Sequence, residues 1–112
     1  MKKIECMVRP SMAGNVRKAL TAGGILGMTV TDVTGAGRQK GFTEKYRVSE
    51  VTINLLPKVK FEVVVKDEDV QKAVDIILEA ARTGEIGDGK IFVSTVEETY
   101  RIRTGEKDEE AL

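Results

Sequence analysis

The segment from residue 58 to residue 65 alternates between apolar side chains and side chains that are mostly charged. Its apolar positions are Val59, Phe61, Val63 and Val65, and the positions between them are Lys58, Lys60, Glu62 and Val64. Successive side chains of a strand point to opposite faces, so this pattern predicts a strand with one buried face. Such a strand needs neighbouring strands and a covering layer, which limits the chain to layered folds that contain a sheet.

Two further strands and a helix are predicted before this segment. A strand over 3–8 buries Ile4, Cys6 and Val8, and a second strand is predicted from Leu26 through Val30. Between them, apolar residues at helical spacing predict a helix that ends at Gly23-Gly24, with Met12, Val16, Ala19 and Leu20 on its buried face. The first half of the chain therefore reads as a β-α-β unit.

The second half repeats this order. The acidic run at 67–69 suits a helix N-terminus, and the helix is predicted to continue to Gly84, with Val70, Ala73, Val74, Ile77 and Leu78 as its buried stripe. A last strand is predicted from Ile91 to Val96. The order β-α-β-β-α-β predicts an α+β, ferredoxin-like sandwich in which two helices cover one antiparallel sheet. All 112 residues form a single domain in this interpretation.

Composition excludes several classes of function. Lys and Arg total 18, as do Asp and Glu, so the net charge is zero and there is no global field to attract nucleic acid. Histidine is absent, which removes the commonest general base and the commonest metal ligand. Aromatic residues make up only 4% of the chain, too few for a base-stacking platform. We therefore expect no nucleic-acid binding and no histidine-based hydrolysis.

The cellular location is predicted from the start of the chain and its single cysteine. Met1-Lys2-Lys3 leads into an alternating segment rather than into a signal-peptide core. Cys6 has no second cysteine with which to form an internal disulfide. No apolar stretch approaches the ~20 residues that span a bilayer. We expect a cytoplasmic protein that does not insert into membranes.

The glycine-rich stretch from Thr83 to Val93 is the strongest local indication of a binding site. Three glycines, Asp88 and Lys90 precede an apolar run. Glycine lets successive backbone amides turn inward to form a concave anion site, and a lysine adds a point charge suited to phosphate. Two more basic, glycine-containing segments lie at 35–41 and 100–106. Together they predict a site for a nucleotide phosphate group.

Several separated motifs, in this order, resemble the PII nitrogen-regulatory signal proteins along almost the whole chain. The motifs are Gly-Met-Thr-Val-Thr at 27–31, Gly-Arg-Gln-Lys-Gly at 37–41, Leu-Pro-Lys-Val-Lys at 56–60, the 83–93 stretch and Arg-Ile-Arg-Thr-Gly-Glu at 101–106. The resemblance implies a homotrimer that covers the open face of the sheet. It also implies a regulatory protein rather than an enzyme, although slow ATP hydrolysis stays open.

The resemblance implies two kinds of ligand at the subunit interfaces. ATP or ADP would bind at residues that hold its phosphates or its adenosine: Thr29, Gly37, Arg38, Glu62, Val64, Gly87, Asp88, Gly89, Lys90, Arg101 and Arg103. The second ligand, 2-oxoglutarate with Mg²⁺, would bind at Arg9, Gln39, Lys40, Gly41 and Lys58, with Gln39 as the metal ligand. Arg101 and Arg103 are two residues apart, so on an extended segment both side chains would point the same way.

The same resemblance divides the site among three segments. A phosphate-binding loop spans about 82–90, and a C-terminal segment spans about 98–112. The segment of about 36–56 is longer than an ordinary connection within a domain and would be the loop that enters target proteins. Those targets would be enzymes, transcription regulators or membrane transporters of nitrogen metabolism. Occupied sites at the base of this loop would bias its conformation.

Several departures from the family pattern limit what is carried over. Val51 stands where many members carry a uridylylated tyrosine, so that modification is excluded at this position. Ser49 stands where some members are phosphorylated, but its usual glycine neighbour is replaced by Val48. Ala36 and the segment from Ser11 replace an aromatic residue and a helix start near the ligands. A specialised relative that senses only ATP and ADP is therefore an alternative.

Other functions are compatible with the same residues. A small ATPase or phosphotransferase would use Lys90 and the two arginines, with Asp88 as its base. An RNA-binding domain of the same topology would need aromatic residues on the exposed strands, where Lys58, Lys60 and Glu62 are predicted instead. A trimer that binds divalent metal would need soft ligands that this chain lacks. The PII-type regulator remains the leading hypothesis.

Overall fold

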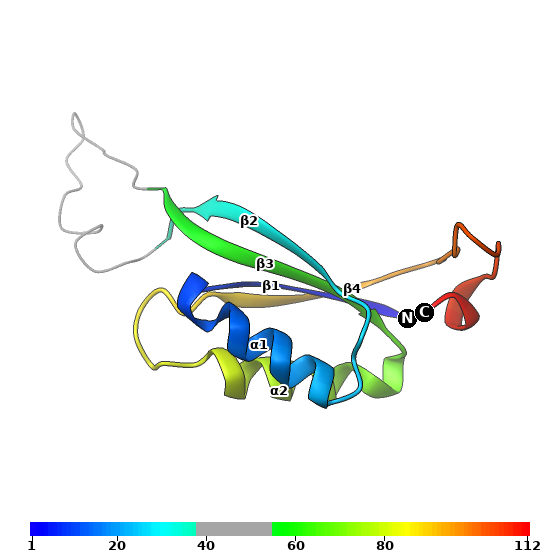
Figure 1. Ribbon diagram of the computed structural model, residues 1–112, viewed down its shortest axis with the longest axis horizontal. Helices are drawn as coiled ribbons and strands as arrows, with labels where there is room; N and C mark the ends of the chain where they lie inside the picture. The colour runs from blue at the N-terminus through cyan, green and yellow to red at the C-terminus, as the bar shows by residue number, and fades with distance from the viewer. Residues whose placement is uncertain (38–54) are drawn as a thin grey trace.

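The computed structural model describes residues 1–37 and 55–112 as one layer of strands and one layer of helices (Figure 1). The strands are β1 (Lys2–Val8), β2 (Thr29–Gly35), β3 (Leu56–Val65) and β4 (Lys90–Thr95). The helices are α1 (Pro10–Ala22) and α2 (Val70–Ala81), with short 3₁₀ turns η2 (Asp67–Asp69) and η3 (Asp108–Ala111). The predicted β-α-β-β-α-β order is confirmed.

The sheet is antiparallel throughout, in the order β2-β3-β1-β4. Both helices lie on the same side of it (Figure 1). Every second residue of the central strands faces them, and Cys6, for example, lies between Phe61 on β3 and Ile91 on β4. The alternation predicted for 59–65 is therefore confirmed.

The core lies between the sheet and the helices. Its buried residues are Ile4, Cys6, Val8, Val16, Leu20, Val59, Phe61, Val63, Val65, Ala73, Ile77 and Ala81. Phe61 is the largest of them and is 2% exposed. Burial raises the pKa of the Cys6 thiol to about 11, in keeping with its predicted place in the core. Seven of these twelve residues come from β1 and β3, and five come from the helices.

Two predicted boundaries were wrong. The second strand begins at Thr29, not at Leu26, because the backbone amide of Ile25 bonds to the carbonyl of Leu20 and ties this segment to the exit of α1. Leu26 is 73% exposed. Helix α2 ends at Ala81, three residues before Gly84, because Arg82 already has an extended backbone.

Within residues 1–37 and 55–112, no helix covers the other face of the sheet. Alternate residues of the two central strands lie there, and four of them form ion pairs: Lys3 with Glu5 and Glu62, and Lys60 with Glu62. Phe92 of β4, which pairs with Glu5, is 51% exposed. It is the only aromatic residue on this face in the part of the chain that the structure describes, so the RNA-binding alternative gains no stacking platform.

Candidate functional site

Asp88 organises the loop that joins α2 to β4. One carboxylate oxygen accepts hydrogen bonds from the backbone amides of Thr83 (2.8 Å) and Gly84 (2.9 Å). The other accepts hydrogen bonds from the hydroxyl of Thr83 and from Nε of Arg9, the latter at 3.0 Å. These bonds, above all the one from the Thr83 hydroxyl, hold the pKa of Asp88 below its ordinary value. Both oxygens are therefore engaged, which leaves Asp88 a poor general base.

Two cations also bind this loop through its carbonyl groups. Nη2 of Arg9 donates to the carbonyl of Ile86 at 2.7 Å, and Nζ of Lys58 donates to the carbonyl of Gly87 at 2.7 Å. Burial, followed by the charge of Arg9, lowers the pKa of Lys58. Arg9 and Lys58, both predicted to bind 2-oxoglutarate, therefore lie together beside the predicted phosphate loop.

Gly89 seats the loop against β1. Its φ is +101°, and a Cβ placed on it would lie 1.7 Å from the carbonyl oxygen of Met7. No side chain fits there, and few residues other than glycine adopt this φ. The close approach lets β4 begin at once, with Lys90 paired to Met7.

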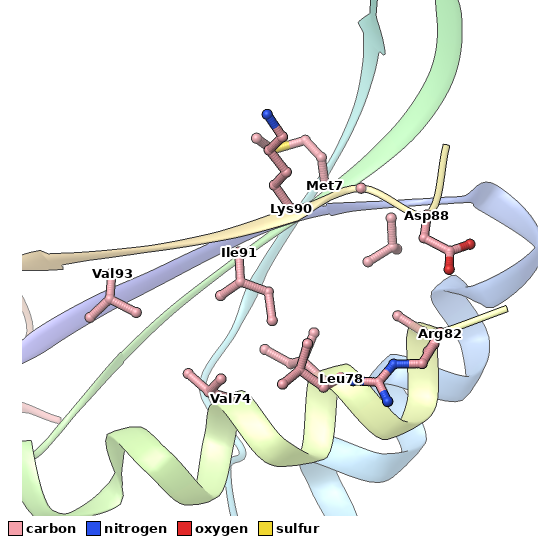
Figure 2. Close-up of a pocket in the computed structure, with 12 residues that line it drawn as sticks. Met7, Val74, Leu78, Arg82, Asp88, Lys90, Ile91 and Val93 are labelled. Carbon is pink, nitrogen blue, oxygen red and sulfur yellow. The ribbon is translucent and has the colours of Figure 1, made fainter. Parts of the chain in front are cut away.

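A cavity of about 610 Å³ lies where this loop meets the end of β2. Its lining includes five predicted nucleotide-binding residues and one predicted for 2-oxoglutarate: Gly37, Gly87, Asp88, Gly89 and Lys90, and Lys58. Met7, Gly35, Ala36, Glu85 and Phe92 complete it. Figure 2 shows the side chains of Lys90 and Met7 pointing away from α2. The cavity thus has a backbone-rich wall and two lysines suited to anionic oxygens.

A second hollow of about 510 Å³ lies on the helix side of β4. Ile91 of β4 faces Val74 and Leu78 of α2 there, with Arg82 and Asp88 at one end (Figure 2). The sequence analysis missed it. The hollow was missed because Leu78 of α2 was predicted to be buried. It is 40% exposed, beside the edge strand β4.

The family resemblance implies that Thr29, Gly37, Glu62 and Val64 hold the adenosine, and three of these residues lie apart from the phosphate loop. Thr29 lies opposite Glu62 in the β2–β3 pair, and Val64 lies opposite Lys3. Strand geometry puts Glu62 and Val64 roughly 13 and 20 Å along β3 from Lys58. Of the adenosine group, only Gly37 lines the cavity at the phosphate loop.

Arg101 and Arg103 lie on a C-terminal arm that projects from the end of the sheet opposite the phosphate loop (Figure 1). Their predicted extended backbone was wrong, because residues 102–104 form a turn. The amide of Gly105 closes this turn on the carbonyl of Arg101 at 2.7 Å, with a φ of +73° at Gly105. Arg101 pairs with Glu106, whereas Arg103 is exposed.

Several predicted positions lie outside the described residues. They are Arg38, Gln39, Lys40, Gly41, Ser49 and Val51, all within the predicted target-binding loop. Residues 1–37 and 55–112 contain no group of three or more Cys, Asp or Glu side chains arranged to hold a metal ion. Nor does any helix among them have the length and apolar character needed to cross a membrane.

Comparison with known proteins assigns the chain to a family. The family model "Nitrogen regulatory protein P-II" matches residues 1–106. Two proteins named nitrogen regulatory protein P-II are similar to this chain over 112 residues, which is 100% of each chain. The protein from Microchaete diplosiphon is 58% identical to it, and the protein from Pasteurella multocida is 55% identical. Nitrogen regulatory protein P-II 1 of Escherichia coli K12 is 54% identical over the same full length. The chain therefore belongs to the nitrogen regulatory protein P-II family.

Proposed function

We propose that this protein is a signal-transduction protein of nitrogen metabolism that binds ATP or ADP, and 2-oxoglutarate with Mg²⁺, between the subunits of a homotrimer. The observation that carries the proposal is the cavity of about 610 Å³ at the phosphate loop, lined by Gly87, Gly89, Lys58 and Lys90. Its one aspartate, Asp88, has both oxygens bonded by the loop and Arg9. The wall that an anion would meet therefore offers backbone groups and two lysines, with Glu85 as its other acidic residue.

The position of the arm supports a site shared between subunits. β4 runs from Lys90 to Thr95, which carries the chain roughly 17 Å from Lys90 before the arm begins. Arg101 and Arg103 therefore lie at the far end of the sheet from Lys90 (Figure 1). Both groups reach one polyphosphate only if they come from different subunits.

The open face of the sheet supports assembly. It combines half-buried ion pairs of Lys3, Lys60 and Glu62 with the exposed ring of Phe92. A second copy would remove the ring from water and strengthen the ion pairs by excluding solvent. A threefold arrangement is what the family resemblance implies.

The 2-oxoglutarate proposal rests on Arg9 and Lys58, which lie beside the phosphate loop. Two cations suit a dicarboxylate. In the described residues no cluster of acidic side chains surrounds this cavity, so Mg²⁺ would be held mainly by oxygens of the ligands, as is usual for this ion. Gln39, outside the described residues, is the protein ligand that we propose for it.

The output would pass through the 36–56 loop to enzymes, transporters or transcription regulators in the cytoplasm. Gly37 lines the cavity and stands at the start of this loop, so a ligand there touches its base. A regulatory role is favoured over phosphotransfer because the candidate base, Asp88, has no free oxygen. Relatives named as regulatory proteins support the same conclusion.

Calorimetric titration tests the proposal. The protein is titrated with ATP and with ADP, and then with 2-oxoglutarate in the presence of each nucleotide and Mg²⁺. Nucleotide-dependent binding of 2-oxoglutarate is expected, and Gln39→Ala should abolish it while sparing ADP. Nucleotide binding without any 2-oxoglutarate response would instead identify the adenylate-only alternative, and binding of neither ligand would refute the proposed function.

A further inference from the structure

Glu106 forms an ion pair with Arg101, one of the two arginines on the C-terminal arm. Its carboxylate accepts a hydrogen bond from Nη1 of Arg101 at 2.8 Å, and Nη2 of the same guanidinium donates to the carbonyl of Leu112 at 3.3 Å. An arginine often binds phosphate by donating two parallel hydrogen bonds from two of its nitrogens. Here both terminal nitrogens already have acceptors within the chain.

The pair belongs to an ordered turn. The hydroxyl of Thr104 donates to the same carboxylate oxygen at 2.7 Å, which fixes the position of Glu106. Backbone bonds close the turn independently of that carboxylate: the amide of Arg101 bonds to the carbonyl of Glu106 at 2.9 Å, and the amide of Gly105 bonds to the carbonyl of Arg101. A change confined to the carboxylate therefore leaves the turn its backbone bonds.

Arg103, two residues further along, differs from Arg101. No ion pair to its side chain is present within residues 1–37 and 55–112, and the residue is exposed. A polyphosphate that reaches this arm would meet one arginine without a carboxylate and one that is already paired. A phosphate that binds Nη1 and Nη2 of Arg101 in parallel then competes with Glu106 for the guanidinium.

We propose that Glu106 is a specificity-determining residue of the nucleotide site, competing with phosphate for Arg101. The inference rests on the proposed function, since it takes Arg101 as a phosphate ligand. Competition penalises every ligand that engages Arg101 and spares any ligand that does not. Glu106 thus lowers the affinity for polyphosphates relative to ligands that do not reach the arm.

The size of the effect follows from exposure. The side chains of Arg101 and Glu106 are 35% and 39% exposed. Ion pairs at such positions change an equilibrium constant by up to roughly fivefold. Glu106→Gln is therefore expected to tighten binding of ATP and of inorganic tripolyphosphate by about two- to fivefold, and to leave binding of adenosine unchanged.

A matched control separates this effect from a general loss of negative charge. Glu98 lies on the same arm and pairs with Lys107 at 3.6 Å. Glu98→Gln removes the same charge without freeing Arg101, so its affinities should equal those of the wild type. Circular dichroism and thermal melting of both variants establish that they fold.

The titrations distinguish failure of this inference from failure of the proposed function. Unchanged or weaker ATP binding by a folded Glu106→Gln protein would overturn the competition, as would an equal gain in Glu98→Gln. If no form binds ATP but Glu106→Gln binds tripolyphosphate more tightly than the wild type, the competition stands and the nucleotide function fails. If no form binds either ligand, both are refuted.

Discussion

Nε of Arg9 lies 3.0 Å from Oδ1 of Asp88, which joins the residue before α1 to the loop before β4 across 79 positions of sequence. Arg9 precedes Pro10, whose ring suits the first position of a helix. The bond therefore ties the start of one helix to the loop that follows the other. Asp88 contributes to the site through the backbone that it holds in place.

Replacing Asp88 by Asn should loosen this loop. An amide offers one acceptor oxygen where the carboxylate offers two, so the two bonds from the amides of Thr83 and Gly84 cannot be kept together with the two from the Thr83 hydroxyl and Nε of Arg9. Hydrogen exchange at these two amides should become faster, while exchange in β1 and β3 is unchanged. Asp75→Asn, which affects only a side-chain bond to Gln71 on α2, is the control. Equal exchange rates in both variants would contradict the role given to Asp88.

The same carboxylate predicts a response to acid. Hydrogen bonds, first of all from the Thr83 hydroxyl, lower the pKa of Asp88 in the folded protein below its ordinary value of 3.8. Its contribution to stability is therefore complete above that value and is lost as the pH falls through the lowered pKa. Urea unfolding at pH 6 and pH 3 should show a larger loss of stability in the wild type than in Asp88→Asn. Asp67 is shifted in the same direction and is present in both proteins, so it cancels from the comparison.

Gly89→Ala should be much more damaging than Gly24→Ala. Both glycines have positive φ, +101° and +86°, but a Cβ on Gly24 would meet nothing within 4 Å. The Gly24 variant bears only the backbone strain, of order 1–2 kcal/mol. The Gly89 variant must also push its loop off Met7, and we expect it to lose nucleotide binding. Thermal melting and ATP titration of the two variants provide the test, and ATP affinity retained in Gly89→Ala would disprove the required close approach.

Lys90→Ala and Arg103→Ala should each weaken nucleotide binding, although the two residues lie at opposite ends of the sheet. Each removes one cation, and a charge-assisted bond to phosphate is worth about 1.5–3 kcal/mol, or roughly 10- to 150-fold in affinity. Calorimetric titration with ATP measures the loss. Lys72→Ala, on the exposed side of α2, should bind like the wild type. Unchanged affinity in both site variants would refute the phosphate site.

The thiol of Cys6 should be almost inert in the native protein. It is fully buried, and burial raises its pKa to about 11. The thiolate that attacks disulfide reagents is therefore scarce and shielded at pH 8. Reaction with an aromatic disulfide reagent should be slow in buffer and fast in concentrated urea. A rapid reaction in buffer would show that the sheet opens at β1.

Periodicity was sufficient to predict most of the fold. The alternation around Phe61 and the helical spacing of Val16 and Leu20 each reflect burial on one face, which a sequence records directly. It failed at Leu26 because the backbone bond from Ile25 to Leu20 extends the helix exit, and such a bond leaves no apolar pattern. Gly24, with its positive φ, was the available indication that the chain was still turning.

The site was harder to predict because the chemical type of a side chain does not reveal which group it will bond to in the folded protein. Asp88 was predicted to bind nucleotide, and its hydrogen bonds within the loop were not foreseen, because Thr83, its main partner, was passed over within the same motif. Thr104-Gly105 was a readable turn signal, yet spacing alone suggested extended arginines. Residues proposed to bind one ligand also need not lie close together within one chain, as Lys90 and Arg103 illustrate.

Because the phosphate loop and the arm lie far apart in one subunit, each nucleotide site of the proposed trimer would be made by two neighbouring subunits. Each subunit would lend Arg103 to one neighbour and receive an arm from the other beside its own Lys90. Two variants that are defective alone, Lys90→Ala and Arg103→Ala, would then complement each other when their subunits are mixed. In every mixed ring, one junction joins an intact loop to an intact arm. In the proposed trimer, nucleotide occupancy would thus depend on the junction between two subunits. A mixed trimer could bind nucleotide although neither variant binds it alone.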